Sequence, residues 1–300
     1  MDEITRIETI DQYDQLFGLE TLHPLVNVID FSKATKTVEY YHMNIGFYSL
    51  FLKDAKCGDL KYGRKYYDYQ EGTVVCMAPG QVIGIDNRKQ APVRTQSIGV
   101  LFHPDLIRGT SLGQNIKNYS FFSYEVSEAL HLSDQEKEIV TDCIHKIQIE
   151  LEHAIDKHSK QLIVRNIELL LDYCMRFYER QFITRNQANK DIIVRFEHLL
   201  DEYFQGQAAM TEGLPSVKYF ADKVCLSPNY FGDLIKKETG KTAQEYIQCR
   251  IIELAKERIL EGTQTVSQIA YELGFQYPQH FSRLFKKHVG HTPNEYKQLN

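Results

Sequence analysis

The sequence predicts an α+β multidomain protein with a β-rich N-terminal domain, a helical middle region and an all-α C-terminal domain. Three observations carry this prediction. Short runs of Val, Ile and Phe, separated by turn residues, fill residues 25–120. Apolar residues at helical spacing begin after Ser133. The last 85 residues contain a duplicated segment. We therefore expect domains at residues 1–132, 133–210 and 211–300.

The N-terminal runs are typical of strands in an antiparallel sandwich or barrel. They read LVNVIDF, NIGFYSLFL, TVVCMAPGQVIGI and SIGVLF, with Gly, Pro, Asn and Asp between them. The tyrosine-rich segment Lys61–Gln70 can line a ligand cavity, but a stripe of β-forming residues on a sheet face is the simpler interpretation.

The middle region is predicted to hold three amphipathic helices. Ser133 and Glu136 form a capping-box pattern at the start of the first helix. The apolar stripes of the three helices are Val140, Ile144, Ile147, Leu151 and Ile155, then Ile163, Ile167, Leu170, Cys174 and Phe177, then Ile192, Phe196, Leu199 and Tyr203. Long helices beside a small barrel are natural surfaces for a homodimer. Gln205–Ser216 has the composition of a linker, so we place the last domain boundary there.

Composition and termini indicate a globular protein of the cytoplasm. Hydrophobic residues make up 43% and charged residues 25% of the 300 residues. A signal peptide has an apolar core, which the N-terminal stretch MDEITRIETIDQYDQ lacks. No apolar run approaches the ~20 residues of a membrane-spanning helix. No C-x-x-C occurs, so we expect buried free thiols rather than a disulfide or zinc framework at Cys57, Cys76, Cys143, Cys174, Cys225 and Cys249.

The duplicated segment pairs Ser227–Tyr246 with Tyr277–Tyr296 at an offset of 50. Nine of the 20 positions are identical, where chance gives about one. The identical pairs are Pro228/Pro278, Phe231/Phe281, Leu234/Leu284, Lys236/Lys286, Lys237/Lys287, Gly240/Gly290, Thr242/Thr292, Glu245/Glu295 and Tyr246/Tyr296.

Each copy is predicted to fold as a helix, a tight turn and a second, amphipathic helix. In the second copy Thr265 caps the first helix, Gly274 supplies the turn and Pro278 opens the second helix. The residues expected to face inward are Phe281, Leu284, Phe285 and His288 in this copy, and Phe231, Leu234 and Ile235 in the first. A polar helix face of this kind fits the ~12 Å major groove of DNA.

The candidate DNA contacts are polar residues of the two predicted units. In the first unit they are Ser227, Asn229, Tyr230, Asp233, Lys236 and Lys237; in the second they are Thr265, Gln276, Gln279, His280, Arg283, Lys286 and Lys287. From Pro215 onward the net charge is +3, against −8 for the preceding residues, which favours an anionic partner. The alternative is a helical hairpin whose basic face is merely solvated.

The C-terminal signature resembles the DNA-binding domain of the AraC family of bacterial transcriptional regulators. The pattern A-x-E-x-G-F, followed by F-x-R-x-F-K-K-x-x-G-x-T-P-x-x-Y, runs from Ala270 to Tyr296. A helix from about Ala243 to Leu260 matches the one that joins the two units. Many members have Ser where this chain has Gln279, so their sequence preference does not transfer. Cys225 occupies the position of Gly274, so we expect a less constrained first turn and a packed cysteine.

The resemblance implies two helix-turn-helix units that enter successive major-groove segments of DNA about 34 Å apart. It also implies a dimeric, effector-responsive activator that contacts RNA polymerase. The order of elements is similar to that of members with a cupin-like β-barrel, a sensory domain, before dimerising helices. Whether the N-terminal domain binds a small-molecule effector or only dimerises stays open. No cofactor, metal ion or catalytic residue is expected, and ligand-binding residues are not assigned.

Two alternative hypotheses make the protein an enzyme. Residues 109–113 match G-x-S-x-G, which would make Ser111 a hydrolase nucleophile if a strand preceded it and a helix followed it. A metal-dependent cupin enzyme would need clustered histidines, whereas His23, His42, His103 and His131 are dispersed.

Overall fold

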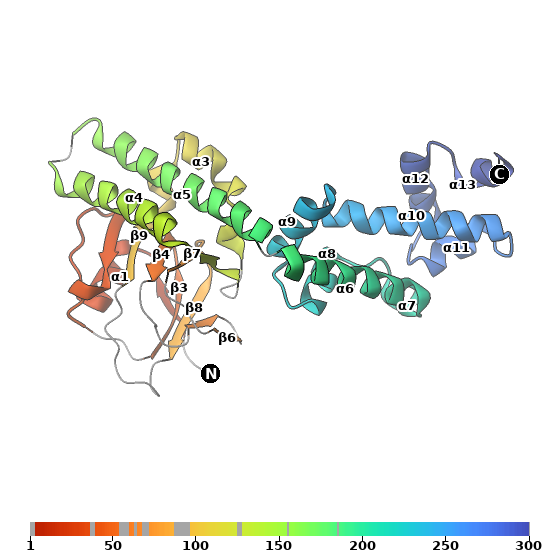
Figure 1. The fold of residues 1–300 in the computed structure, drawn as a ribbon, viewed down its shortest axis with the longest axis horizontal. Coiled ribbons are helices and arrows are strands. Elements are labelled where there is room, and N and C mark those ends of the chain that lie inside the picture. The colour runs from red at the N-terminus through yellow and green to blue at the C-terminus, as the bar shows by residue number, and fades with distance from the viewer. Residues whose placement is uncertain are drawn as a thin grey trace. The chain divides into compact units, whose positions relative to one another are not determined.

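The computed structural model describes residues 4–36, 40–53, 60–62, 65–67, 72–86, 97–124, 128–154, 156–184 and 186–299. The chain divides into two compact units, Met1–Thr184 and Arg185–Asn300 (Figure 1). The boundary expected at residues 210/211 lies inside the second unit.

The described strands of the first unit form two five-stranded sheets. One has the order β1-β3-β8-β5-β6 and the other β10-β7-β4-β9-β2. All described pairings are antiparallel except that of β1 with β3. The strands are β1 (Thr5–Ile7), β2 (Val26–Asp30), β3 (Tyr40–Ile45), β4 (Tyr48–Lys53), β5 (Leu60–Tyr62), β6 (Lys65–Tyr67), β7 (Thr73–Met77), β8 (Val82–Asp86), β9 (Ser97–Phe102) and β10 (Leu130–His131).

A short helix, α1 (Ile10–Phe17), completes the core that the two sheets share. Thr9 and Gln12 form a capping box at its start. The ring of Tyr13 lies edge-on to Phe47 at a centroid distance of 5.9 Å, and Phe17 contacts Phe31 at 5.1 Å. The aromatic side chains of α1 therefore fill space between the sheets.

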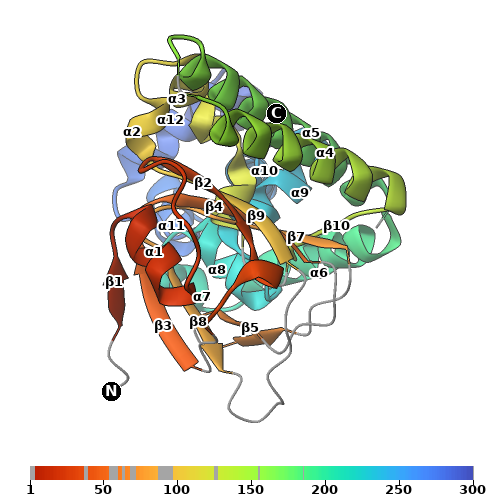
Figure 2. The same ribbon diagram turned by 90° about the vertical axis from the view of Figure 1, so that its left-hand side faces the viewer.

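Two long helices, α4 (Asp134–Glu152) and α5 (Ser159–Thr184), cover the other face of the second sheet (Figure 2). Strands β4 and β7 are consequently buried on both faces, apart from the half-buried Tyr48. Ser133 and Glu136 form the predicted capping box of α4. Between β9 and β10 lie α2 (Pro104–Ile107), α3 (Ser111–Asn115) and three-residue to four-residue 3-10 turns.

The strand and helix predictions for this unit are confirmed in part. The four apolar runs form β2, β3–β4, β7–β8 and β9, and the α4 and α5 stripes are buried, except that Ile155 lies outside the described residues. The described strands form two separate sheets, the sandwich alternative, rather than a closed barrel. Segments of Lys61–Gln70 form a β5–β6 hairpin, but their side chains lie outside the described residues.

The thiols divide into two groups. Cys76, Cys143 and Cys174 are buried free thiols, as predicted, and burial raises the pKa of each. Cys249 is half-buried and Cys225 is exposed, so burial was the wrong expectation for these two. Cys57 lies outside the described residues.

The described residues of the second unit form eight helices. They are α6 (Asn186–Gln205), α7 (Ala208–Glu212), α8 (Val217–Lys223), α9 (Pro228–Thr239), α10 (Ala243–Glu261), α11 (Val266–Glu272), α12 (Pro278–Val289) and α13 (Pro293–Leu299). The pairs α8–α9 and α11–α12 are the two predicted helix-turn-helix units, and α10 joins them (Figure 1). In the part of the chain that the structure describes, no helix combines the length and apolar character needed to cross a membrane.

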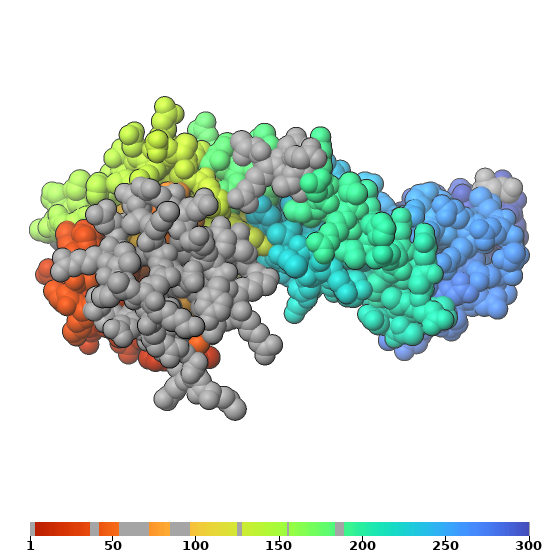
Figure 3. All heavy atoms as spheres, turned by 60° about the horizontal axis from the view of Figure 1, so that its bottom comes forward, coloured from red at the N-terminus to blue at the C-terminus, as the bar shows by residue number. Residues whose placement is uncertain are grey.

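Helix α6 belongs to this helical unit. Phe196 is fully buried, and its ring lies edge-on to Phe220 of α8 at 5.1 Å and to Phe231 of α9 at 5.0 Å. The outward side of α6 remains at the surface, where Figure 3 shows residues near 200 as a green band. The buried side carries Phe196, Leu200, Tyr203 and Phe204, while Leu199, predicted to face inward, is half-buried.

Candidate nucleic-acid interface

A glycine common to both copies ends α9 and α12 in the same way. Gly240 after α9 has φ 73° and Gly290 after α12 has φ 87°. The N–H of Gly240 donates to the carbonyl of Lys236 at 2.9 Å, and that of Gly290 donates to the carbonyl of Lys286 at 2.9 Å. Only glycine adopts this left-handed conformation without strain, which explains its presence in both copies.

The shared Thr and Glu residues start the helix that follows. The carboxylate of Glu245 accepts the backbone N–H of Thr242 at 2.9 Å, and Glu295 accepts that of Thr292 at 2.7 Å. These backbone hydrogen bonds hold the pKa of both glutamates below its ordinary value. The repeat thus encodes a turn and a capping box as well as an exposed face.

The first turn copies the second without glycine. Cys225 has φ 62° and Gly274 has φ 90°. The residue after each one donates its N–H to the corresponding alanine carbonyl, Leu226 to Ala221 at 2.9 Å and Phe275 to Ala270 at 3.0 Å. The expectations of a looser first turn and a packed Cys225 are therefore wrong. The hydrogen bonds force the same backbone, and the left-handed residue points its side chain to solvent.

The core side of α12 is shorter than predicted. Phe281 and Phe285 are fully buried and Leu284 is half-buried. Tyr296 of α13 packs on Phe285 at a centroid distance of 5.5 Å. His288 was predicted to face inward but is exposed, because the apolar contact ends at Phe285, one turn earlier.

The predicted DNA contacts of the second helix-turn-helix pair, α11–α12, all lie at the surface. Gln279, Arg283 and Lys286 follow one another at helical spacing on the side of α12 away from Phe281. The hydroxyl of Thr265 accepts the N–H of Gln268 at 3.2 Å, so it also caps α11. The exposed residues are Thr265, Gln276, Gln279, His280, Arg283, Lys286 and Lys287.

One exposed aromatic residue at this surface was missed by sequence reasoning. Tyr277 is 57% exposed, and its ring lies 5.5 Å from that of His280. It stands at the N-cap of α12 without a capping side-chain hydrogen bond. The signal was in the repeat, because Ser227 occupies the same place in the first copy and Tyr is a poor cap.

The first helix-turn-helix pair, α8–α9, exposes fewer of its predicted DNA contacts. Asn229, Lys236 and Lys237 are exposed and Asp233 is half-buried. The hydroxyl of Ser227 accepts the N–H of Tyr230 at 3.2 Å as the N-cap of α9. Ser227 and Tyr230 are both buried. The structure therefore assigns Ser227 and Tyr230 to the framework of α9, and it brings Asn229, Asp233, Lys236 and Lys237 to the surface.

The two exposed faces differ in charge. Asp233 of α9 stands at the position that Arg283 occupies in α12, while Asn229 corresponds to Gln279. The lysine pair is common to both helices. The α12 face is therefore the more basic of the two, and it has the greater attraction for an anionic partner.

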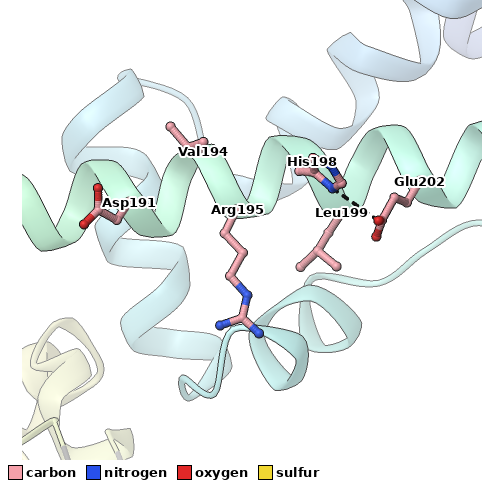
Figure 4. A pocket seen from close by; sticks show the side chains of 6 residues that line it. All are labelled: Asp191, Val194, Arg195, His198, Leu199 and Glu202. Atoms are coloured by element: carbon pink, nitrogen blue, oxygen red, sulfur yellow. Dashed lines mark ion pairs between the residues drawn. The ribbon is translucent and has the colours of Figure 1, made fainter.

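A shallow hollow of about 530 Å³ lies along the outward side of α6 (Figure 4). Arg195 reaches from it to donate to the carbonyl of Lys223 at 2.9 Å. His198 Nδ1 lies 3.3 Å from a carboxylate oxygen of Glu202 at the exposed surface. Arg195, His198 and Glu202 of the hollow therefore make surface interactions within α6 and with α8.

The described residues give little support to the two enzyme alternatives. Ser111 opens α3 and follows α2, not a strand, so the turn is not a nucleophile elbow. Its hydroxyl donates to Glu168 at 3.0 Å. Among the described residues, no group of three His, Cys, Asp or Glu side chains is arranged to hold a metal ion.

Comparison with known proteins matches the helical unit. A helix-turn-helix domain family matches residues 220–299. The chain is 37% identical over 86 residues to the uncharacterized transcriptional regulatory protein YesN of Bacillus subtilis, covering 28% of this chain and 23% of YesN. It is 31% identical over 145 residues to the transposon Tn10 TetD protein of Escherichia coli, covering 48% of this chain and 91% of TetD. YesN is thus matched over about a quarter of its length.

Among solved structures, the chain is similar to the C-terminal domain of AraT, a response regulator from Geobacillus stearothermophilus. The two are 25% identical, with a TM-score of 0.33, and the match covers 36% of this chain and 85% of that one.

Proposed function

Because the chain belongs to the AraC family of transcriptional regulators, we propose that it is a sequence-specific DNA-binding regulator that activates transcription. The observation that carries the proposal is the exposed face of α12. Gln279, Arg283 and Lys286 share one side of a helix whose other side is anchored by buried Phe281 and Phe285.

In this proposal α9 and α12 enter successive major-groove segments, about one helical turn of 34 Å apart. Arg283 and Gln279 are long enough to reach base edges, where Arg pairs with guanine and Gln with adenine. Lys286 and Lys287 contact phosphates, which contributes affinity without sequence preference. On the first helix, Asn229 and Asp233 are the base-reading candidates, with Asp233 suited to the amino group of cytosine.

Arg283→Ala is expected to weaken binding to a preferred site by about 1–3 kcal/mol, with a smaller loss on random DNA, because a base contact exists only on the preferred sequence. The preferred site is first obtained by selecting a random-sequence library with the full chain, and binding is then measured by fluorescence anisotropy. Equal losses on both DNAs reassign Arg283 to a phosphate.

The matched contrast is a variant with Lys286→Ala and Lys287→Ala. It should weaken binding to every DNA and reduce the slope of log K against log salt by at most about two units. If the unmodified chain binds no DNA at low salt, the proposed function is wrong.

The same proposal includes a homodimer formed through α5. Leu162, Leu169 and Ile183 are 44%, 40% and 60% exposed, and they lie seven and fourteen residues apart on one side of the helix. A repeat of seven keeps apolar residues on one seam between paired helices. Arg165 and Glu179 flank the seam, and in an antiparallel pair each would approach the other's copy.

Replacing Leu162 and Leu169 together by Glu is expected to reduce the mass in solution from twice to once the chain mass of 35.0 kDa. The seam would then place like charges opposite each other in a desolvated contact. Light scattering after size exclusion measures the mass. Leu260→Glu on α10, where Leu260 is 51% exposed, is the control that should leave the dimer intact. A monomeric unmodified chain contradicts this part.

We assign the first unit a sensory role, as a cupin-like domain that binds a small-molecule effector. Its support is the pair of sheets around a common core. The alternative, a unit that only dimerises, has its own support, because Tyr13 and Phe17 of α1 occupy space between the sheets. In either form the regulator would act in the cytoplasm, where it would contact promoter DNA and RNA polymerase.

A further inference from the structure

Helix α6 runs alongside α10 in the same direction. Asp201 of α6 accepts from Arg250 of α10 at 2.7 Å, and Glu197, one turn earlier, accepts from the hydroxyl of Tyr246. Both pairs are separated by 49 residues, so the contacts advance together along the two helices (Figure 1). The helix that joins the two helix-turn-helix units therefore has a parallel companion.

The first part of α6 is fixed to the first helix-turn-helix pair, α8–α9. Phe196 packs between Phe220 and Phe231, as described above. Asn189 donates its side-chain amide to the carboxylate of Glu238 in α9 at 3.1 Å. These contacts tie α6 to the helix that carries the first exposed face.

The segment after α6 lies directly against the turn between α11 and α12. A Cβ atom at Gly274 would stand 2.7 Å from the carbonyl carbon and oxygen of Gly213 and 2.9 Å from the carbonyl oxygen of Ala209. The hydroxyl of Tyr203 donates to the carbonyl of Gly213 at 2.9 Å, which holds this loop beside α6. Residues 205–216, predicted as a linker, are packed where they meet the α11–α12 turn.

One arginine joins three helices at the same end. The guanidinium of Arg258 on α10 donates to the carbonyl of Phe204 in α6 at 3.2 Å and to the carboxylate of Glu272 in α11 at 3.1 Å. The end of α6 and helix α11 are therefore held by the same side chain.

From these contacts we infer that α6, α7 and Gly213 form a brace that sets the position of α12 relative to α9, in parallel with α10. A single connecting helix leaves the α11–α12 pair free to rotate about the end of that helix. Two connections that are each fixed to both helix-turn-helix pairs restrict this motion. The brace would hold the two reading faces at the spacing that two successive major-groove segments require, so its role in recognition rests on the proposed function.

The brace is tested without DNA by measuring the distance between two spin labels in the full chain. One label is placed on the exposed native Cys225 and the other on an exposed position of α12 through His288→Cys. Cys57 and Cys249 are replaced by Ser, while the buried Cys76, Cys143 and Cys174 remain, since burial raises their pKa and protects them from the label.

Two independent variants loosen the brace at different points. Gly213→Ala forces the loop from φ 84° and ψ −152°, a conformation almost restricted to glycine. Arg258→Gln removes the clamp on Phe204 and Glu272. Each is expected to widen the distance distribution about twofold. Arg250→Gln is the matched control, because it breaks an α6–α10 pair that does not contact the α11–α12 pair, and it should leave the width unchanged.

An unchanged width in both Gly213→Ala and Arg258→Gln overturns the inference, as does equal widening in Arg250→Gln. Amide hydrogen exchange of α12 checks that each variant remains folded. If one variant unfolds the second unit, the other decides the outcome. On selected DNA, a loosened brace should reduce the discrimination against half-sites moved apart by about two base pairs. Absence of DNA binding by the unmodified chain would contradict the proposed function and leave the distance result standing.

Discussion

Phe196→Ala is expected to destabilise the second unit by about 3–5 kcal/mol, the cost typical of removing a fully buried aromatic ring. Phe196 has no exposed surface and its ring contacts Phe220, Phe231 and Tyr246 at centroid distances of 5.0–5.5 Å. The loss leaves a cavity between α6, α8 and α9. Amide hydrogen exchange in the full chain measures the effect, since a chain of two units need not unfold in one step.

Val194→Ala, on the same helix, is the control. Val194 is 64% exposed, so its truncation should change the stability by less than about 0.5 kcal/mol. If the two substitutions have the same small effect, α6 does not contribute to the core of the second unit. A fragment that begins at residue 211 would then be as stable as one that begins at residue 185.

Gly274→Ala is expected to destabilise the second unit by about 2–4 kcal/mol. Two costs add at this position. The left-handed φ of 90° strains any residue with a Cβ atom by about 1–2 kcal/mol, and the new Cβ meets backbone atoms of Gly213 at 2.7 Å. Backbone on the opposite side cannot rotate away as a flexible side chain can. Exchange of the amides of α11 and α12 reports the loss.

Gly290→Ala separates the two costs. Gly290 has nearly the same φ, 87°, but its Cβ would meet no atom within 4 Å. It should lose only about 1–2 kcal/mol, the cost of the left-handed backbone. Equal losses at positions 274 and 290 would mean that the contact with Gly213 is loose and that backbone conformation alone selects glycine.

The local signals in the sequence predicted the helical unit well. Caps and turns depend on residues close together in the chain, so Thr265, Gly274 and Pro278 located α11, the turn and α12 from the sequence alone. The same reasoning could have found α1, because Thr9 and Gln12 form a capping box before Ile10, Tyr13 and Phe17 at helical spacing. The exposed face of α12 followed from helical spacing in the same way.

Contacts between distant segments could not be predicted from periodicity. The stripe of α6 was identified, but its partners Phe220 and Phe231 lie 24 and 35 residues further along the chain. A helical wheel also leaves the edge of a buried face undefined. Tyr230 is buried although its counterpart His280 is exposed, and His288 is exposed although its spacing placed it with Phe281 and Phe285. Which neighbour covers each edge decides these cases.

The capping boxes that follow α9 and α12 also lower the positive electrostatic potential around the lysines of these two helices. Backbone hydrogen bonds are the main cause of the lowered pKa of Glu245 and of Glu295. Lys287 and Lys236 add to the lowering at Glu245, and Lys286 adds to it at Glu295. The same attraction acts in reverse, because each carboxylate offsets part of the positive potential around its lysines. The capping box of α11 uses the neutral Gln268 and has no such effect. In the proposed function, the shared Glu residues would reduce non-specific attraction to polyanions and leave a larger share of the binding energy to the side chains that distinguish one sequence from another.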